Sequence, residues 1–196
     1  MARIATPLPG YQAPAASFDQ PFEMLSACHD RVRRTLALLQ RLVDHLQTNG
    51  VDDSARSAAH DVLRYFDIAA PHHHEDEERH LFPRLLAGGD AALADAVHRL
   101  QSDHLCMSAT WGALRSALVA LRDGTREHLT AADEALAAEF IGLYSEHMRI
   151  EDERVFPAAL AATPPGEIGN IGDEMAARRG ATRPEGATTP AARESR

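Results

Sequence analysis

The chain has 196 residues, with 20 Lys and Arg against 29 Asp and Glu and a formal net charge of −9. This length suits one well-filled domain, and the acidic charge excludes a protein that binds phosphate backbones, so no nucleic-acid partner is expected. No apolar run approaches the roughly 20 residues of a membrane span, and the start lacks a signal-peptide pattern. We therefore expect a cytoplasmic protein without a membrane partner, in which Cys28 and Cys106 are small buried residues rather than a disulfide framework.

The two ends of the chain differ in composition from its middle. Residues 1–18 carry three prolines among alanines, which predicts an irregular arm. Residues 163–196 are rich in Gly, Pro, Arg and Ala and are expected to form a flexible tail, because they bury too little apolar surface to offset their ordering entropy. A short helix around GDEMAARRG, residues 172–180, fits within this tail. The main domain is thus predicted at residues 19–162.

The first predicted helix runs from Asp19, the candidate N-cap, to Asn49 and Gly50, with Pro21 in its first turn. Its apolar residues recur with the 3–4 spacing of an amphipathic helix, and one histidine occupies a position in the stripe. The members are Phe22, Leu25, His29, Val32, Leu36, Leu39, Val43 and Leu46.

The second predicted helix runs from about Asp53 to Ala87 and contains Pro71 and Pro83. A proline inside a helix removes a hydrogen bond and clashes with the preceding turn, so a kink or break is expected near residue 71. The inward stripe of this helix is Val62, Phe66, Ala69, His73 and Glu77.

The third predicted helix follows Gly89 and Asp90 and ends at Asp123, and the fourth follows Thr130, with Asp133 completing a capping box. The third stripe is Leu93, Val97, Leu100, His104, Met107, Trp111, Leu114, Leu118 and Leu121. The fourth is Leu136, Phe140, Leu143, His147 and Glu151. Helices joined by short loops, without strand signals, predict an all-α antiparallel up-down four-helix bundle.

An internal repeat selects among the many potential ligands of the second helix. HHHEDEERHLFP (72–83) aligns with EHMRIEDERVFP (146–157), and the first helix repeats in the third. The repeat pairs His29 with His104, His73 with His147, and Glu77 with Glu151. It pairs His72 with Glu146, His74 with Met148, and His80 with Arg154, so these three histidines are expected to bond around the site or to contact solvent.

The repeated residues suit a metal centre. Residues i and i+4 lie on one helix face, so each His and Glu pair can converge on one ion or on two adjacent ions. Two buried carboxylates would cost several kcal/mol without cations, which favours metal binding over packing alone. A mixed set of imidazoles and carboxylates indicates iron above all, with manganese or zinc as alternatives, and leaves positions open for a diatomic ligand.

These runs resemble the hemerythrin-like HHE cation-binding domains across roughly residues 20–160, and the EE-x-x-LFP phrase after a histidine is the most specific part. The resemblance implies a four-helix bundle that holds two iron ions in a non-haem, oxo- or hydroxo-bridged centre. Its implied ligands are His29, His73, Glu77, His104, His147 and Glu151, with the two glutamates bridging.

Two departures separate the chain from oxygen-carrying hemerythrins. These carriers have a second histidine four residues after the one on the third helix, where this chain has Ser108. They also use His-x-x-x-x-Asp on the fourth helix, which leaves Asp152 open as a substitute for Glu151. Reversible oxygen carriage is therefore not expected. The set is more similar to relatives linked to iron or oxygen sensing and to repair of oxidatively damaged iron centres.

The favoured function is a di-iron protein that binds or reacts with oxygen, nitric oxide or related oxidants, for sensing, scavenging or iron handling. One alternative is a di-iron enzyme, such as an oxidase or a peroxide-consuming protein. Such an enzyme would need a proton donor near an open metal position, and Tyr65 and Tyr144 are expected to lie about two turns before the ligands. The other alternative is a partner-binding bundle with a structural metal, and the sequence does not specify a protein partner.

Overall fold

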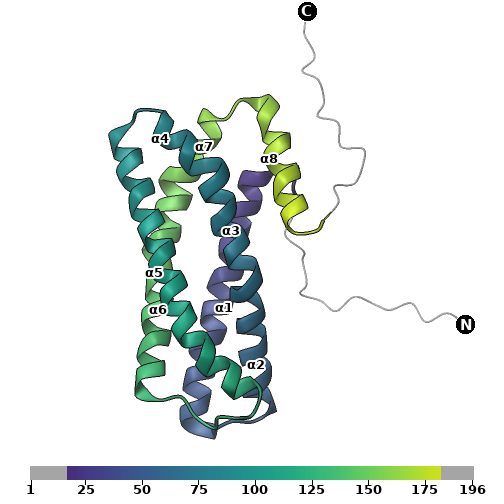
Figure 1. The fold of residues 1–196 in the computed structure, drawn as a ribbon, viewed down its shortest axis with the longest axis vertical. Helices are drawn as coiled ribbons and strands as arrows, with labels where there is room; N and C mark the ends of the chain where they lie inside the picture. The colour runs from purple at the N-terminus through teal and green to yellow at the C-terminus, as the bar shows by residue number, and fades with distance from the viewer. Residues whose placement is uncertain (1–16, 182–196) are drawn as a thin grey trace, which may run out of the picture.

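The computed structural model describes residues 17–181, which are helical almost throughout (Figure 1). The elements, with η for a π-helical turn, are α1 (Pro21–Asn49), α2 (Asp53–Arg64), η1 (Tyr65–Ala69), α3 (Ala70–Asp76), η2 (Glu77–Leu81), α4 (Phe82–Ala87), α5 (Ala91–Arg122), α6 (Ala131–Ile150), η3 (Glu151–Val155), α7 (Phe156–Ala162) and α8 (Pro165–Arg178). Within this part of the chain there is no β-strand, so the all-α prediction is confirmed. Between residues 17 and 181, the helices lack the length and the hydropathy that a membrane span requires.

The helical stretches pack as a bundle. Helix α1 contacts α2 and α6, and α5 contacts the same two helices, so these four elements enclose a common interior. Helix α8 lies against the outside of α1, near the end that also carries α4 and α7 (Figure 1).

Side chains cap the starts of α2, α5 and α6, and the caps of α5 and α6 are those that the sequence predicts. Asp90 accepts hydrogen bonds from the backbone N–H groups of residues 92 and 93, and Thr130 forms a complete capping box with Asp133. The prediction of Asp19 as the first N-cap is wrong, because Gln20 holds that position. Pro21 takes the first helical position, where its missing N–H costs nothing, and this fixes the preceding residue as the cap. Asp19 instead pairs with the Ser17 hydroxyl in the turn before the helix.

Each π-helical turn precedes an α-helical segment whose second residue is a proline. The prolines are Pro71, Pro83 and Pro157. A proline cannot donate to the carbonyl four residues before it and clashes with that carbonyl, and a wider turn relieves the clash without ending the helix. The internal repeat supplies a comparison. It pairs Pro71 with Ser145, and α6 is a regular α-helix around Ser145. The break expected near residue 71 is therefore a π turn in a continuous helix.

Two apolar clusters fill the interior, and the predicted ligands separate them along each helix. The α8-side cluster includes Leu25, Phe82, Leu100, Val155, Phe156 and Met175. The opposite cluster includes Leu39, Phe66, Met107, Leu114, Phe140 and Met148. On α1, for example, His29 lies between Leu25 of one cluster and Val32 of the other. The ligands thus form a polar layer that crosses the core.

Helix α8 extends further towards the N-terminus than the short helix predicted at residues 172–180, and it is packed. Met175 is 0% exposed within the α8-side cluster. Asp76, which is also 0% exposed, forms ion pairs with Arg178 and Arg179 at the end of α8. The predicted flexible remainder of the tail, beyond residue 181, and nearly all of the N-terminal arm lie outside the described residues.

The cysteine prediction is wrong for Cys106, which is exposed, while Cys28 is half-buried. Cys106 lies two residues after His104, so the α-helical period turns it away from the inward stripe.

Candidate metal centre

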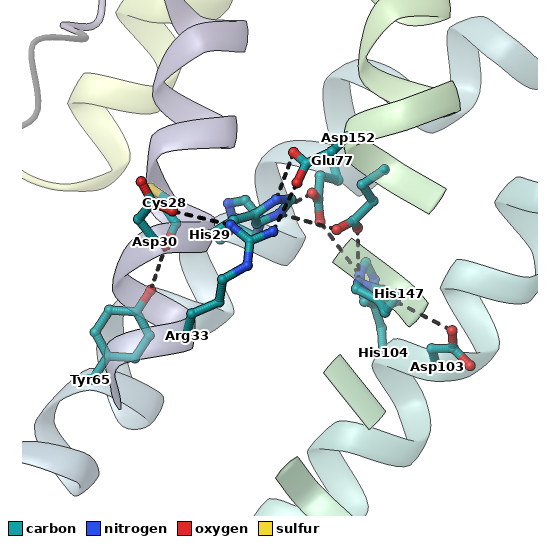
Figure 2. A network of polar contacts seen from close by, with 12 residues as sticks. Cys28, His29, Asp30, Arg33, Tyr65, Glu77, Asp103, His104, His147 and Asp152 are labelled. Atoms are coloured by element: carbon teal, nitrogen blue, oxygen red, sulfur yellow. Dashed lines mark hydrogen bonds and ion pairs between the residues drawn. The ribbon is translucent and has the colours of Figure 1, made fainter. Parts of the chain in front are cut away.

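The structure brings the six predicted ligand residues together in the polar layer of the core. Figure 2 labels four of them, His29, Glu77, His104 and His147. Each of the six comes from a different point of the bundle: His29 from α1, His73 from α3, Glu77 from the start of η2, His104 from α5, His147 from α6 and Glu151 from the start of η3. All six are buried, and both glutamates are 0% exposed. Both glutamates open a π-helical turn, a feature often found at functional sites.

The ligand atoms form two groups that share both carboxylates. The first group is His29, His73, Glu77 and Glu151, and the second group is Glu77, His104, His147 and Glu151. Within each group the ligand atoms lie within 4.8 Å of one another. This arrangement offers two adjacent cation positions.

Each glutamate reaches both groups with different oxygens. Glu151 places Oε2 3.2 Å from His29 Nε2 and Oε1 2.8 Å from His147 Nε2. Glu77 places Oε1 3.1 Å from His73 Nε2 and Oε2 3.4 Å from His104 Nε2. The two oxygens of one carboxylate thus point to different sides of the layer, as a bridging ligand requires.

Several of these atoms have no hydrogen bond of good geometry among the described residues. They are the carboxylate oxygens of Glu77 and Glu151 and the Nε2 atoms of His104 and His147. In the first group, two Nε2 atoms face each other, since those of His29 and His73 lie 3.2 Å apart. Buried polar atoms without partners are costly. A pair of cations in the layer would satisfy all of them, so the residues present fit a dinuclear metal centre.

Carboxylates outside the layer orient three of the four histidines. Nδ1 of His29 lies 2.9 Å from Asp152, Nδ1 of His104 lies 3.0 Å from Glu78, and Nδ1 of His147 lies 3.4 Å from Asp103. A carboxylate at Nδ1 holds the proton on that nitrogen and leaves the Nε2 lone pair free for a metal.

The sequence left Glu151 and Asp152 open as alternative ligands, and the structure gives them different positions. Glu151 belongs to both groups, whereas Asp152 lies behind His29 and also accepts from the Arg33 guanidinium at 3.1 Å. Asp152 therefore orients a histidine in this arrangement.

The fourth histidine, His73, has a different neighbour. Its Nδ1 lacks a hydrogen bond of good geometry, and the Cys28 thiol lies close to it. Burial raises the pKa of this thiol, but His73 and the charges of Arg31 and Arg179 lower it, and the net pKa is below the usual value.

In the metal-free protein, the histidines and carboxylates of the layer shift one another's pKa values. Burial alone would lower the pKa values of His29, His73 and His104, but the carboxylates beside them raise all three above the usual value. Burial would raise the pKa of Glu77, whereas His73 and His104 hold it well below its usual range. Protons on the histidines thus stand in for cations, and a metal ion must displace them.

His74 lies inside the layer, which the repeat did not predict. It forms a third group with His104 and His147, whose ligand atoms also lie within 4.8 Å of one another. Its ring stacks on that of His104, with centroids 4.0 Å apart and an interplanar angle of 14°. Its partner in the repeat, Met148, is buried in the core, so the position faces inward in both halves. The inward direction of this position on the helix would therefore have identified His74 as part of the layer. The comparison of residue types between the two repeats did not.

The other two histidines at the margin do not join these groups. His72 is half-buried, and His80 faces α8, with Nε2 3.7 Å from Glu174.

The placement of Tyr144 corrects the expectation from the sequence. Tyr144 is 3% exposed, with its ring centroid 6.4 Å from that of His147 and 6.3 Å from that of His74. It lies within one turn of His147, because it precedes that residue by three positions in the regular helix α6. Burial raises the pKa of its hydroxyl, so this group stays protonated at neutral pH. Tyr65 is more remote, and its hydroxyl donates to the Cys28 carbonyl at 3.4 Å.

A cavity of about 260 Å³ borders the second group. Its lining includes His74, His104, Ser108, Trp111, Phe140 and Tyr144. Ser108 occupies the place where the resemblance would put a further histidine, and the small side chain leaves space there. The cavity gives small molecules a route to this side of the layer.

Comparisons with known proteins agree with the geometry. A Haemophilus influenzae protein (strain ATCC 51907 / DSM 11121 / KW20 / Rd), described as uncharacterized, is 31% identical over 164 residues, which cover 84% of this chain and 92% of that protein. Residues 20–159, which include all six predicted ligands, match the hemerythrin HHE cation-binding domain. The chain therefore belongs to the hemerythrin HHE cation-binding domain family.

Proposed function

We propose that the chain is a non-haem di-iron protein that binds or reacts with oxygen, nitric oxide or related oxidants. One iron would be held by the first group and one by the second, on the antiparallel four-helix scaffold typical of the family. Sensing, scavenging and iron handling all fit this chemistry. Bound iron would supply the redox change and the position at which a small oxidant binds.

The observation that carries the proposal is the sharing of Glu77 and Glu151 between two histidine groups. A single structural ion would need only one group, so a second complete group favours a dinuclear centre. The donor set of imidazoles and carboxylates suits iron, whereas a structural zinc site is usually a closed tetrahedron rich in thiolates or histidines. Manganese uses similar donors and remains the alternative metal.

The chain's own residues prepare the layer for this role. Asp152, Glu78 and Asp103 fix the imidazole orientation, and the two apolar clusters exclude bulk water from both sides. The cavity beside His104 admits a small molecule to the second group. Binding and access are thus provided by different parts of the same layer.

The first experiment combines metal analysis with optical titration of the iron-loaded protein. We expect two iron ions per chain after expression with ample iron, and spectral changes when the reduced protein meets oxygen, peroxide or nitric oxide. One zinc per chain, or no metal in carefully handled protein, would contradict the dinuclear assignment. Two ions that respond to none of these molecules would indicate a structural metal in a partner-binding bundle.

A second candidate function is a di-iron oxidase or peroxide-consuming enzyme. The cavity and the buried Tyr144 hydroxyl favour it, because they offer substrate space and a group that holds a proton near the second group. Repeated turnover of peroxide that falls in Tyr144→Phe, but not in the remote Tyr65→Phe, would support the enzyme. A single stoichiometric oxidation in both variants would exclude it.

A further inference from the structure

His74 stands beside the second group and has no equivalent beside the first. It follows His73 on α3, but its ring contacts the histidines of the other helices: its centroid lies 4.0 Å from that of His104 and 6.0 Å from that of His147. The matching position in the repeat is Met148, which offers no imidazole. The surroundings of the two groups therefore differ chemically, although the internal repeat pairs the six predicted ligands symmetrically.

The cavity that borders the second group lies on the same side of that group as His74. On α5, the residue one turn after His104 is Ser108, which lines the cavity together with His74. An ion bound by His104, His147 and the two carboxylates would face this cavity. His74 and His104 both line this cavity, and His74 stands outside the second group while its ligand atom lies within 4.8 Å of those of His104 and His147.

We propose that His74 is a third histidine ligand of the ion in the second group, so that the two metal positions differ in their number of histidines. The inference rests on the proposed dinuclear function and extends it to a residue that the internal repeat excludes. A metal ion lies near the plane of the imidazole that binds it, and two nearly parallel stacked rings cannot both meet this condition for one ion. Binding therefore requires the His74 ring to turn out of its stack on His104. The adjoining cavity provides the space for this turn.

The test is a titration of the full-length metal-free protein with cobalt(II) under anaerobic conditions. Wild type is expected to bind two ions. His74→Ala should weaken one of the two binding events by at least about tenfold, the smaller loss seen when a histidine's supporting partner is removed, and should leave the other event unchanged. The matched control is His72→Ala, since this half-buried neighbour belongs to no ligand group, and its titration should equal that of wild type.

A second readout separates ligation from support. In the cobalt(II) protein, ring N–H protons of metal-bound histidines give strongly shifted proton resonances, and His74→Ala should lose one such resonance relative to His72→Ala. Free imidazole added to His74→Gly should restore the weakened binding event, because the deleted ring adjoins the cavity. If His74→Ala does not fold, His74→Gln keeps most of the volume and should show the same two losses.

The outcomes distinguish this inference from the proposed function. If wild type binds fewer than two ions, the dinuclear function fails, and this inference fails with it. If wild type binds two ions and His74→Ala retains both affinities and all shifted resonances, only the role of His74 is overturned. A weakened event without loss of a resonance would also overturn ligation, because His74 would then act only by supporting His104.

Discussion

The contrast between Glu151 and Asp152 gives the sharpest test of the helical register at the site. These neighbours contact His29 from opposite sides: Glu151 lies 3.2 Å from Nε2, which faces the layer, and Asp152 lies 2.9 Å from Nδ1, which faces outward. We compare Asp152→Ala with the isosteric Glu151→Gln. The first removes an orienting partner, and the second removes a negative charge that two cations would share.

The structure sets different magnitudes for the two changes. Loss of a partner that orients a metal-bound histidine costs about 10–100-fold in affinity, or about 1.4–2.8 kcal/mol. The Asp152 side chain is 31% exposed, so water can replace it at Nδ1, and we expect the lower end of this range. Only the ion bound by His29 should be affected. Glu151 is 0% exposed and belongs to both groups, so Glu151→Gln should weaken both ions, and by more than Asp152→Ala does.

The assay is metal content after dialysis against a graded series of chelator concentrations. Asp152→Ala should keep two ions without chelator and lose one ion at a lower chelator concentration than wild type does. Glu151→Gln should fall below two ions throughout. The opposite result, in which Glu151→Gln retains two ions and Asp152→Ala does not, would refute the reasoning and identify Asp152 as the ligand.

Three further predictions concern the site and its surroundings. His73→Ala should lower the metal content, whereas the exposed His98→Ala should leave it unchanged, as measured by elemental analysis; equal loss in both would contradict the layer. The histidines with raised pKa values stabilise the metal-free fold fully below about pH 6.5, and this contribution is lost as the pH rises through the raised values. The depressed pKa of Glu77 makes its contribution present above about pH 4.5 and lost on further acidification. Melting temperatures of metal-free protein should therefore decline from about pH 6.5 upward, and a rise over that interval would contradict the coupling. Deletion of residues 165–196 should lower the melting temperature, because it removes Met175 from the core, but should leave two ions bound; an unchanged melting temperature would show that α8 adds no stability.

The sequence was sufficient for the helical fold and for the location of the six clustered residues. Helical periodicity carries one histidine on each long stretch into the core, and the repeat identifies His73 and Glu77 among many acidic and basic neighbours. Residue types matched across the two halves were the decisive signal. The same signal did not place His74 inside the layer, because its counterpart Met148 faces inward but has no imidazole.

Other features depend on geometry that residue spacing does not encode. A 3.6-residue period assumes a regular helix, whereas the turns before Pro71, Pro83 and Pro157 are π-helical and shift the phase of the residues that follow. Tyr144 was predicted about two turns before the ligands, although it precedes His147 by three residues in the regular helix α6 and so lies within one turn of that residue. Helix α8 was missed in part because its composition is rich in glycine, while its burial depends on a tertiary surface supplied by α1.

The polar layer also has a consequence for how the protein opens. A continuous core unfolds as one unit, but here two apolar clusters are joined through charged and titratable groups whose mutual attraction depends on their protonation. In the metal-free protein, the end of the bundle formed by α4, α7 and α8 should open more readily than the rest, and its amides should exchange with solvent sooner. Ions that bind residues of α1, α3, α5 and α6 together would link the two apolar clusters on either side of the layer. Hydrogen exchange would then report one cooperative unit where the metal-free protein has two.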